Sequence, residues 1–235
     1  MSADLTPDQR VSRQRADHRL LNALDASDFP IAVSGHRNAE DARTGRSPVP
    51  VGDRNPASHF RVIYDFDTLR APDVRHRPTV VHVAPLANGH YPRTAPSAWV
   101  VGDVVPWTPH FTANMPICHG ERLWTANRTQ LVDYVIHIGK LLNFDEPPPP
   151  RGYIGWNRAA ITYWRDKLGY RPLDPDLRYP VIRIEDVMRP GAFSGGEDTS
   201  PSPDRFRRAD VAPADGAGGP RQAAFRGRRV ARAGS

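Results

Sequence analysis

The residues with the clearest potential for chemistry lie in 109-PHFTANMPICHGERLW-124, which holds Cys118, the only cysteine of the chain. His110 and Asn114 precede the cysteine, and His119 follows it directly. A cysteine acts as a nucleophile when it is ionised and reachable, and the polar, turn-rich residues before Cys118 favour exposure. As an imidazolium, His119 would lower the pKa of the thiol, but adjacent side chains often point apart. The segment therefore indicates a candidate covalent site.

Other interpretations of Cys118 stay open at this point. A single cysteine is more often a small buried hydrophobic residue than a nucleophile. The spacings of His110, Cys118 and His119 lie outside the usual zinc patterns, so we expect no metal site and no cofactor. A cysteine peptidase would need a base within hydrogen-bond reach of the thiol. His137 is the only histidine after His119, and it falls in a helical pattern with an apolar face.

Composition divides the chain into three parts. Of its 235 residues, 189–235 are rich in Gly, Pro, Ser, Ala and Arg and poor in aliphatic side chains, which predicts a disordered tail. We expect a flexible N-terminus at 1–9 and one folded domain at 10–188. Much of the net charge of +6 lies in the tail, so we expect at most weak, non-specific contact with nucleic acid.

The sequence also predicts a cytoplasmic protein. It contains no run of eighteen apolar residues, and its first residues lack the basic and then apolar order of a signal peptide. A single cysteine cannot form an internal disulfide, which agrees with a reducing compartment. We therefore expect no membrane association.

Hydrophobic spacing predicts an α+β domain. Residues 10–24 show the period of an amphipathic helix. Four apolar or alternating runs bounded by Pro or Gly read as strands, at 29–35, 59–69, 78–86 and 97–105. No helix-length segment of helical pattern separates them, so we expect a four-stranded antiparallel meander, with a long loop at about 35–58.

An irregular segment with the cysteine follows the strands, and then the period becomes helical again. The pattern predicts a long helix at 127–143, with Asn127 as its N-cap and Gln130 as the reciprocal partner. Four prolines from Pro147 prevent that helix from continuing. A last helix is expected at 156–169, with Gly169 as its C-cap. Its tryptophans are expected to be core or helix-packing residues.

The order of these features resembles the ubiquitin-conjugating enzyme (UBC-like) family. The pieces that carry the resemblance are 91-YPRTAP-96, 109-PHF-111 with Asn114, 117-IC-118, Trp124 and 131-LVDYVIHIGKLLNFDEP-147. They correspond to the Tyr-Pro turn, the His-Pro-Asn motif, the Ile-Cys pair, a tryptophan and the helix that ends in Leu-Leu before prolines. The His-Pro-Asn motif is not intact, and the interval from the cysteine to the tryptophan is short. In both respects the sequence resembles the divergent bacterial members of the family.

The resemblance implies that Cys118 carries the C-terminus of a ubiquitin-like protein as a thioester and passes it to an amine. In such a site a side-chain donor stabilises the thioester oxygen, and Asn114 is the chemical equivalent of the family's asparagine while His110 is the positional one. An acidic residue in the loop after the long helix, Asp145 or Glu146, would help the amine to lose its proton.

Tyr91, Pro92 and Trp124 would support the site. The implied partners are a ubiquitin-like protein, an activating enzyme of the ThiF type and, in the same pathway, a JAB-type peptidase. The alternative is a catalytically inactive UBC-like module that binds a ubiquitin-like protein or an activating enzyme, with Cys118 structural.

Overall fold

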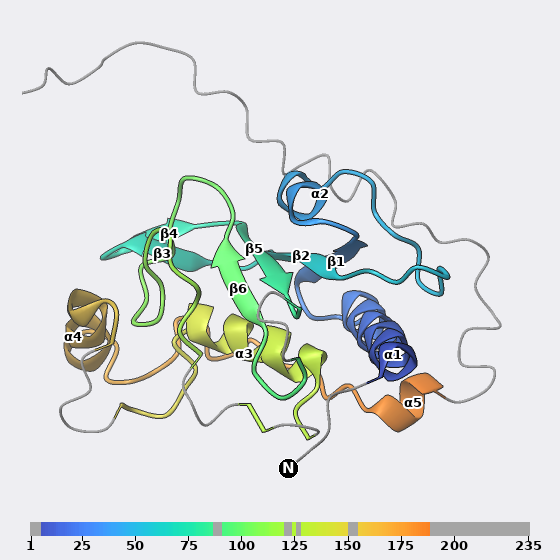
Figure 1. Cartoon of the computed structure of the whole chain (residues 1–235). Coiled ribbons are helices and arrows are strands. Elements are labelled where there is room, and N and C mark those ends of the chain that lie inside the picture. The colour runs from blue at the N-terminus through green and yellow to red at the C-terminus, as the bar shows by residue number, and fades with distance from the viewer. Residues whose placement is uncertain (1–5, 87–90, 120–123, 126–127, 150–154, 189–235) are drawn as a thin grey trace, which may run out of the picture. The chain divides into compact units, whose positions relative to one another are not determined.

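The computed structural model of the chain describes residues 6–86, 91–119, 124–125, 128–149 and 155–188. As the sequence pattern predicts, these residues form a mixed α+β fold with an N-terminal helix, a four-stranded antiparallel sheet and later helices (Figure 1). They belong to one compact unit, Met1–Thr199. In this part of the chain no helix has both the length and the apolar character needed to cross a membrane. The tail expected at 189–235 lies outside the described residues.

The first helix, α1 (Pro7–Asp25), begins earlier than expected because a capping box precedes it. The Gln9 backbone N–H donates to the Thr6 hydroxyl at 3.3 Å, and the Thr6 N–H donates to the Gln9 side chain at 2.9 Å. Proline at the first helical position adds to this start, because its missing N–H would have no partner there. Residues 7–9, expected in the flexible N-terminus, therefore form the first turn of α1.

The main sheet has the order β1 (Ile31–His36), β2 (His59–Tyr64), β5 (Thr79–Ala84) and β6 (Ser97–Val100), and all its pairs are antiparallel. The expected meander is thus confirmed, with one interruption. The run expected as a single strand at 59–69 is divided between two sheets. Its first part is β2 of the main sheet, and its last residues pair with a different strand. Two further strands, β3 (Thr68–Ala71) and β4 (Val74–His76), form a separate hairpin between β2 and β5.

The stretch 35–58 was expected as a long loop, and it contains the short helix α2 (Ala39–Thr44). Asn38 caps this helix by accepting a hydrogen bond from the Asp41 N–H at 2.8 Å. Gly45 ends it with φ of 75°, in the left-handed region that favours glycine. The helix α2 has six residues, and only one of them, Ala42, is buried. Its sequence therefore shows no periodic spacing of apolar residues from which a helix could be predicted.

The core lies between the sheet, α1 and α3 (Leu131–Leu142). The helix α3 buries most of its side chains, and the Tyr64 hydroxyl on β2 donates to the Val135 carbonyl at 2.8 Å. Figure 1 shows α3 and α2 on opposite sides of the sheet. The start expected at 127 is wrong, because α3 begins at Leu131, where the N–H of Gln130 donates to the Asp133 carboxylate at 2.8 Å. Asn127 itself lies outside the described residues.

Two short helices complete the described chain. The helix α4 (Arg158–Asp166) begins after Asn157, whose side chain accepts from the Ala160 N–H at 3.1 Å. It ends at Asp166, before the expected C-cap, and Gly169 turns the chain afterwards with φ of 57°. Trp164 of this helix is buried in a second cluster with Leu69 and Phe144, whereas Trp156 is exposed. The last helix, α5 (Ile184–Met188), was not expected.

We expect the free energy of unfolding to fall in acid because three histidines are buried or partly buried. Burial lowers the pKa of His18, His82 and His137 to about 4 each, whereas an unfolded histidine has its ordinary value near 6.5. The unfolded chain therefore binds more protons as the pH falls below 6.5, and stability falls progressively towards pH 4. Asp17 opposes this loss, because its pKa is raised to about 6 and the folded state takes up its proton first. One carboxyl offsets only part of the effect of three imidazoles.

Urea unfolding between pH 7 and 5 measures this effect. We expect the free energy of unfolding to fall over that range, and His82→Gln to reduce the slope by at most about 1.4 kcal/mol per pH unit, the value for one whole proton, which is approached only near pH 5. A free energy of unfolding that stays constant from pH 7 to 5 would contradict the buried, neutral state of these histidines.

Candidate active site

Two backbone hydrogen bonds, from Ile117 and from Cys118 itself, hold the cysteine in place. The Ile117 N–H donates to the Ala98 carbonyl of β6 at 2.8 Å, and the Ile117 side chain is buried in the core. The Cys118 N–H donates to the His110 carbonyl at 3.1 Å. The chain thus turns back between residues 110 and 118 and places the histidine beside the cysteine.

The side chains of Cys118, His110 and Glu146 form a continuous chain of interactions. His110 Nε2 lies 2.6 Å from Glu146 Oε1, and the His110 side chain also interacts with the Cys118 side chain. His110 is only 7% exposed, whereas Cys118 is partly exposed. Glu146 comes from the loop after α3. The imidazole therefore lies between a reachable thiol and a carboxylate, the arrangement of a nucleophile, its base and the group that orients the base.

The surroundings of His110 favour its charged form. Burial alone disfavours an imidazolium, but hydrogen bonds and charge interactions with Cys118 and Glu146 outweigh burial and raise the pKa of His110 to about 9. His110 is therefore protonated at neutral pH. A positive charge beside a thiol favours the thiolate, which is the reactive form of cysteine.

Other titratable side chains surround this chain of interactions. The ring of Tyr134 on α3 packs edge-on against His119, with the centroids 5.4 Å apart, and against Trp124 at 6.3 Å. His137, also on α3, interacts with the backbone of His119, and burial lowers the pKa of its imidazole to about 4. The peptidase alternative required His137 to point at Cys118, but the histidine that interacts with the Cys118 side chain is His110.

The predicted supporting residues form a network that joins α1 to the site. The Tyr91 hydroxyl donates to the buried Asp17 carboxylate at 2.6 Å, and Arg13 binds the same carboxylate at 3.1 Å. The Trp124 indole N–H donates to the Pro92 carbonyl at 2.8 Å, and the rings of Tyr91 and Trp124 lie 5.6 Å apart. Because Trp124 also contacts Tyr134, this network reaches the residues around Cys118.

Two other predicted site residues lie elsewhere. Asn114 is exposed, has φ of 61°, and lines a cavity of about 500 Å³ together with His82 and Trp99. The N–H of Asp145 donates to the Lys140 carbonyl at 2.8 Å. Of the two acidic residues in this loop, Glu146 is the one that meets His110.

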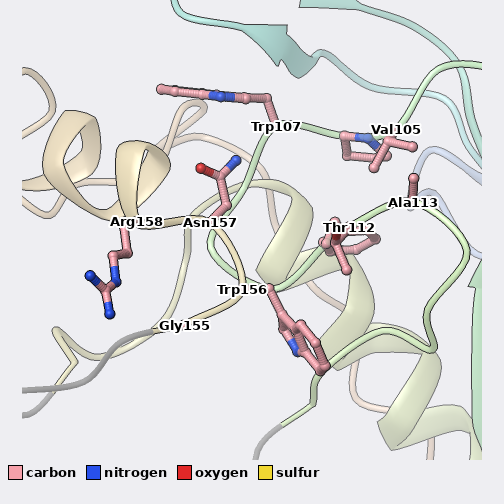
Figure 2. Close-up of a pocket in the computed structure, with 10 residues that line it drawn as sticks. Val105, Trp107, Thr112, Ala113, Gly155, Trp156, Asn157 and Arg158 are labelled. Carbon is pink, nitrogen blue, oxygen red and sulfur yellow. The ribbon is translucent and has the colours of Figure 1, made fainter. Parts of the chain in front are cut away.

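A second cavity, of about 590 Å³, borders the segment that carries His110. Figure 2 shows Trp107 and Trp156 on opposite sides of this cavity, with Asn157 between them. The backbone N–H groups of Trp156 and Asn157 donate to the Pro109 carbonyl at 3.0 and 3.3 Å, which ties the start of α4 to the residue before His110. The sequence analysis assigned Trp156 to the core or to helix packing, and it did not predict the 47% exposure of this side chain at the cavity.

Neither the protein-family models nor the curated proteins include a match to this chain. Among the described residues, no group of three or more His, Cys, Asp or Glu side chains is arranged to hold a metal ion.

Proposed function

We propose that the chain is a UBC-like transferase that carries a ubiquitin-like protein as a thioester on Cys118 and passes it to an amine. The observation that carries this proposal is the chain of contacts from Cys118 through His110 to Glu146. The order of elements supports it as well, because a helix and a four-stranded meander precede the cysteine and a long buried helix follows it. The proposed partners are a ubiquitin-like protein, a ThiF-type activating enzyme and a JAB-type peptidase of the same pathway.

The first chemical step is thioester exchange. The Cys118 thiolate attacks the activated C-terminal carbonyl of the ubiquitin-like protein, a new C–S bond forms, and the previous C–S bond to the activating enzyme breaks with release of its thiolate. No proton has to leave Cys118 during this attack, because the His110 imidazolium already favours the ionised thiol. The partly exposed position of Cys118 makes this attack feasible.

The second step transfers the acyl group to an amine. A C–N bond forms, the C–S bond breaks, and the departing Cys118 thiolate again lies beside the His110 imidazolium, so that it needs no proton to leave. The amine proton is released to a base. Glu146 bears a carboxylate near the site, but it is engaged with His110 at 2.6 Å, so its main role is to hold that imidazolium in place.

The inactive binding module explains the same contacts less well. A histidine and a carboxylate that are both largely withdrawn from water are costly to bury. A purely structural Cys118 would give no reason to place that pair against the thiol. The alternative nevertheless makes a clear prediction, since its Cys118→Ala variant would keep every binding property of the wild type.

A cysteine hydrolase is the second candidate, and the same three side chains favour it. The two enzymes differ in the acceptor, which is an amine for the transferase and water for the hydrolase. With p-nitrophenyl acetate, a transferase should release one burst of p-nitrophenol and then stall until an amine is added. A hydrolase should continue to turn over in water alone.

Reconstitution tests the proposal directly. The purified chain is mixed with ATP, a ThiF-type activating enzyme and a ubiquitin-like protein from the same source, and intact masses are recorded. We expect an adduct that thiol reagents remove, no adduct with Cys118→Ala, and an adduct that resists thiol reagents with Cys118→Ser, because an oxygen ester replaces the thioester. Identical masses for the wild type and Cys118→Ala would reject the transferase, provided that the activating enzyme has itself become loaded.

A further inference from the structure

The hydroxyl of Tyr134 is a buried polar group without a hydrogen-bond partner in the part of the chain that the structure describes. The whole residue is 0% exposed. Other buried tyrosines of this fold use their hydroxyls, since Tyr64 donates to the Val135 carbonyl at 2.8 Å and Tyr91 to Asp17 at 2.6 Å. A buried hydroxyl that makes no hydrogen bond costs stability, and a phenylalanine at 134 would avoid that cost.

The position of this hydroxyl connects it to the candidate nucleophile. The Tyr134 ring packs against the ring of His119, the residue next to Cys118, and against Trp124 on another side. The hydroxyl interacts with the charge of Cys118 but is not hydrogen-bonded to the thiol. An acyl group on Sγ places its carbonyl oxygen beyond the sulfur by one C–S and one C–O bond, so the oxygen meets other side chains than the sulfur does.

The site needs such a donor, because the two residues expected to supply it are placed otherwise. His110 is engaged between Cys118 and Glu146. Asn114 is exposed in the cavity that Trp99 lines. Acyl transfer places negative charge on the carbonyl oxygen, and a donor that is already in position there stabilises the transition state.

We propose that Tyr134 donates the hydrogen bond that stabilises the acyl oxygen during transfer on Cys118. The inference rests on the proposed function, because it assigns a role in the same reaction. As the thiolate pair forms the C–S bond, the π pair of the carbonyl moves to oxygen, and the phenol O–H donates to that oxygen without giving up its proton. When the intermediate collapses, the C=O bond re-forms and the leaving group departs with its electron pair.

The local charges keep this phenol protonated. Burial, and then the negative charge of Cys118, raise the pKa of Tyr134 above its ordinary value near 10. The other titratable groups that surround Cys118 are His110 and Glu146, which pair with each other, and His119 and His137 near the Tyr134 side of the site. Tyr134 therefore remains a donor throughout the pH range in which the Cys118 thiolate reacts.

Two reactions of Cys118 separate this role from a structural one. Acylation by p-nitrophenyl acetate passes through an oxyanion, whereas alkylation by iodoacetamide is a displacement without one. Both rates are measured for the wild type, Tyr134→Phe and the matched variant Tyr64→Phe, and the rates with Cys118→Ala are subtracted. Thermal unfolding of each variant is recorded in parallel.

We expect Tyr134→Phe to slow acylation about a hundredfold, the effect of removing one oxyanion donor, with alkylation within about twofold of the wild type. Its unfolding temperature should stay equal or rise, because no hydrogen bond is lost. Tyr64→Phe should behave in the opposite way, with a lower unfolding temperature and both rates unchanged, because its hydroxyl is bonded to Val135.

Equal acylation rates for Tyr134→Phe and the wild type would overturn the inference, and so would a parallel loss of acylation and alkylation. Either result would leave the proposed function standing if the wild type still reacts at Cys118. A wild type that reacts no faster than Cys118→Ala would instead reject the proposed function itself.

Discussion

His110→Gln should lower the rate at which iodoacetamide alkylates Cys118 at pH 6.5 by about a hundredfold. The imidazolium of His110, whose pKa is about 9, lies beside the thiol and favours the thiolate. Glutamine keeps a polar side chain of similar length but has no charge. An ordinary thiol with a pKa of about 8.5 is only about 1% ionised at pH 6.5, so the loss of the charge leaves little thiolate to react.

Two further variants show whether the effect belongs to the chain of three side chains. Glu146→Gln removes the charge that helps to keep His110 protonated, and it should slow alkylation less than His110→Gln does. His119→Gln changes the histidine next to the thiol, whose ring packs on Tyr134, and it should leave the rate within a few fold of the wild type. If His119→Gln has the larger effect, the assignment of His110 as the partner of Cys118 is wrong.

Arg13→Met should lower the free energy of unfolding by about 3–5 kcal/mol at pH 7, as the breaking of a buried ion pair does. The Arg13 side chain is 17% exposed, that of Asp17 is 2% exposed, and their closest atoms lie 3.1 Å apart. Arg13 also donates to the Thr129 carbonyl at 3.3 Å, close to the start of α3. Methionine keeps much of the volume but leaves the Asp17 carboxylate buried with Tyr91 as its remaining side-chain donor.

The same variant has a recognisable pH dependence. Burial raises the pKa of Asp17 to about 6 even though Arg13 lowers it, so removal of Arg13 raises it further. The folded variant therefore binds the Asp17 proton more readily than the unfolded chain does, and its deficit should be smaller at pH 5 than at pH 7. Urea unfolding at both pH values measures the difference.

The exposed pair of Arg37 and Asp53, also 3.1 Å apart, provides the control. Arg37→Met should cost no more than about 1 kcal/mol, because solvent screens this pair. Equal costs for Arg13→Met and Arg37→Met would contradict a structural role for the buried network.

The sequence predicted the parts of the fold that repeat a simple period. The four strands of the sheet alternate or run apolar between Pro and Gly, and α3 shows a wide apolar face, so both were found. The helix α2 was missed because it buries one side chain only. The hairpin of β3 and β4 was missed because apolar and polar residues keep alternating from β2 into β3. The sequence pattern does not show that β3 pairs with β4 rather than with a strand of the main sheet.

The sequence pointed to the residue at the centre of the candidate site, but it could not predict which side chains contact one another there. Cys118 was proposed as the nucleophile because it is the only cysteine and lies in a polar segment. The contact of His110 with Glu146 joins residues 36 positions apart in two loops, and no periodic pattern encodes it. Tyr134 was missed because an aromatic residue on the buried face of a helix looks like a core residue. What distinguishes it is a hydroxyl that has no hydrogen-bond partner among the described residues.

The most direct measurement for the central claim is the ultraviolet absorbance of the Cys118 thiolate near 240 nm. The difference between the wild type and Cys118→Ala isolates this thiol, because the chain has no other cysteine. If His110 holds Cys118 as a nucleophile, the thiolate signal is already present at pH 7 and is largely lost in His110→Gln. A signal that appears only around pH 8.5, as for an unperturbed cysteine, and that is the same in both proteins would contradict the account.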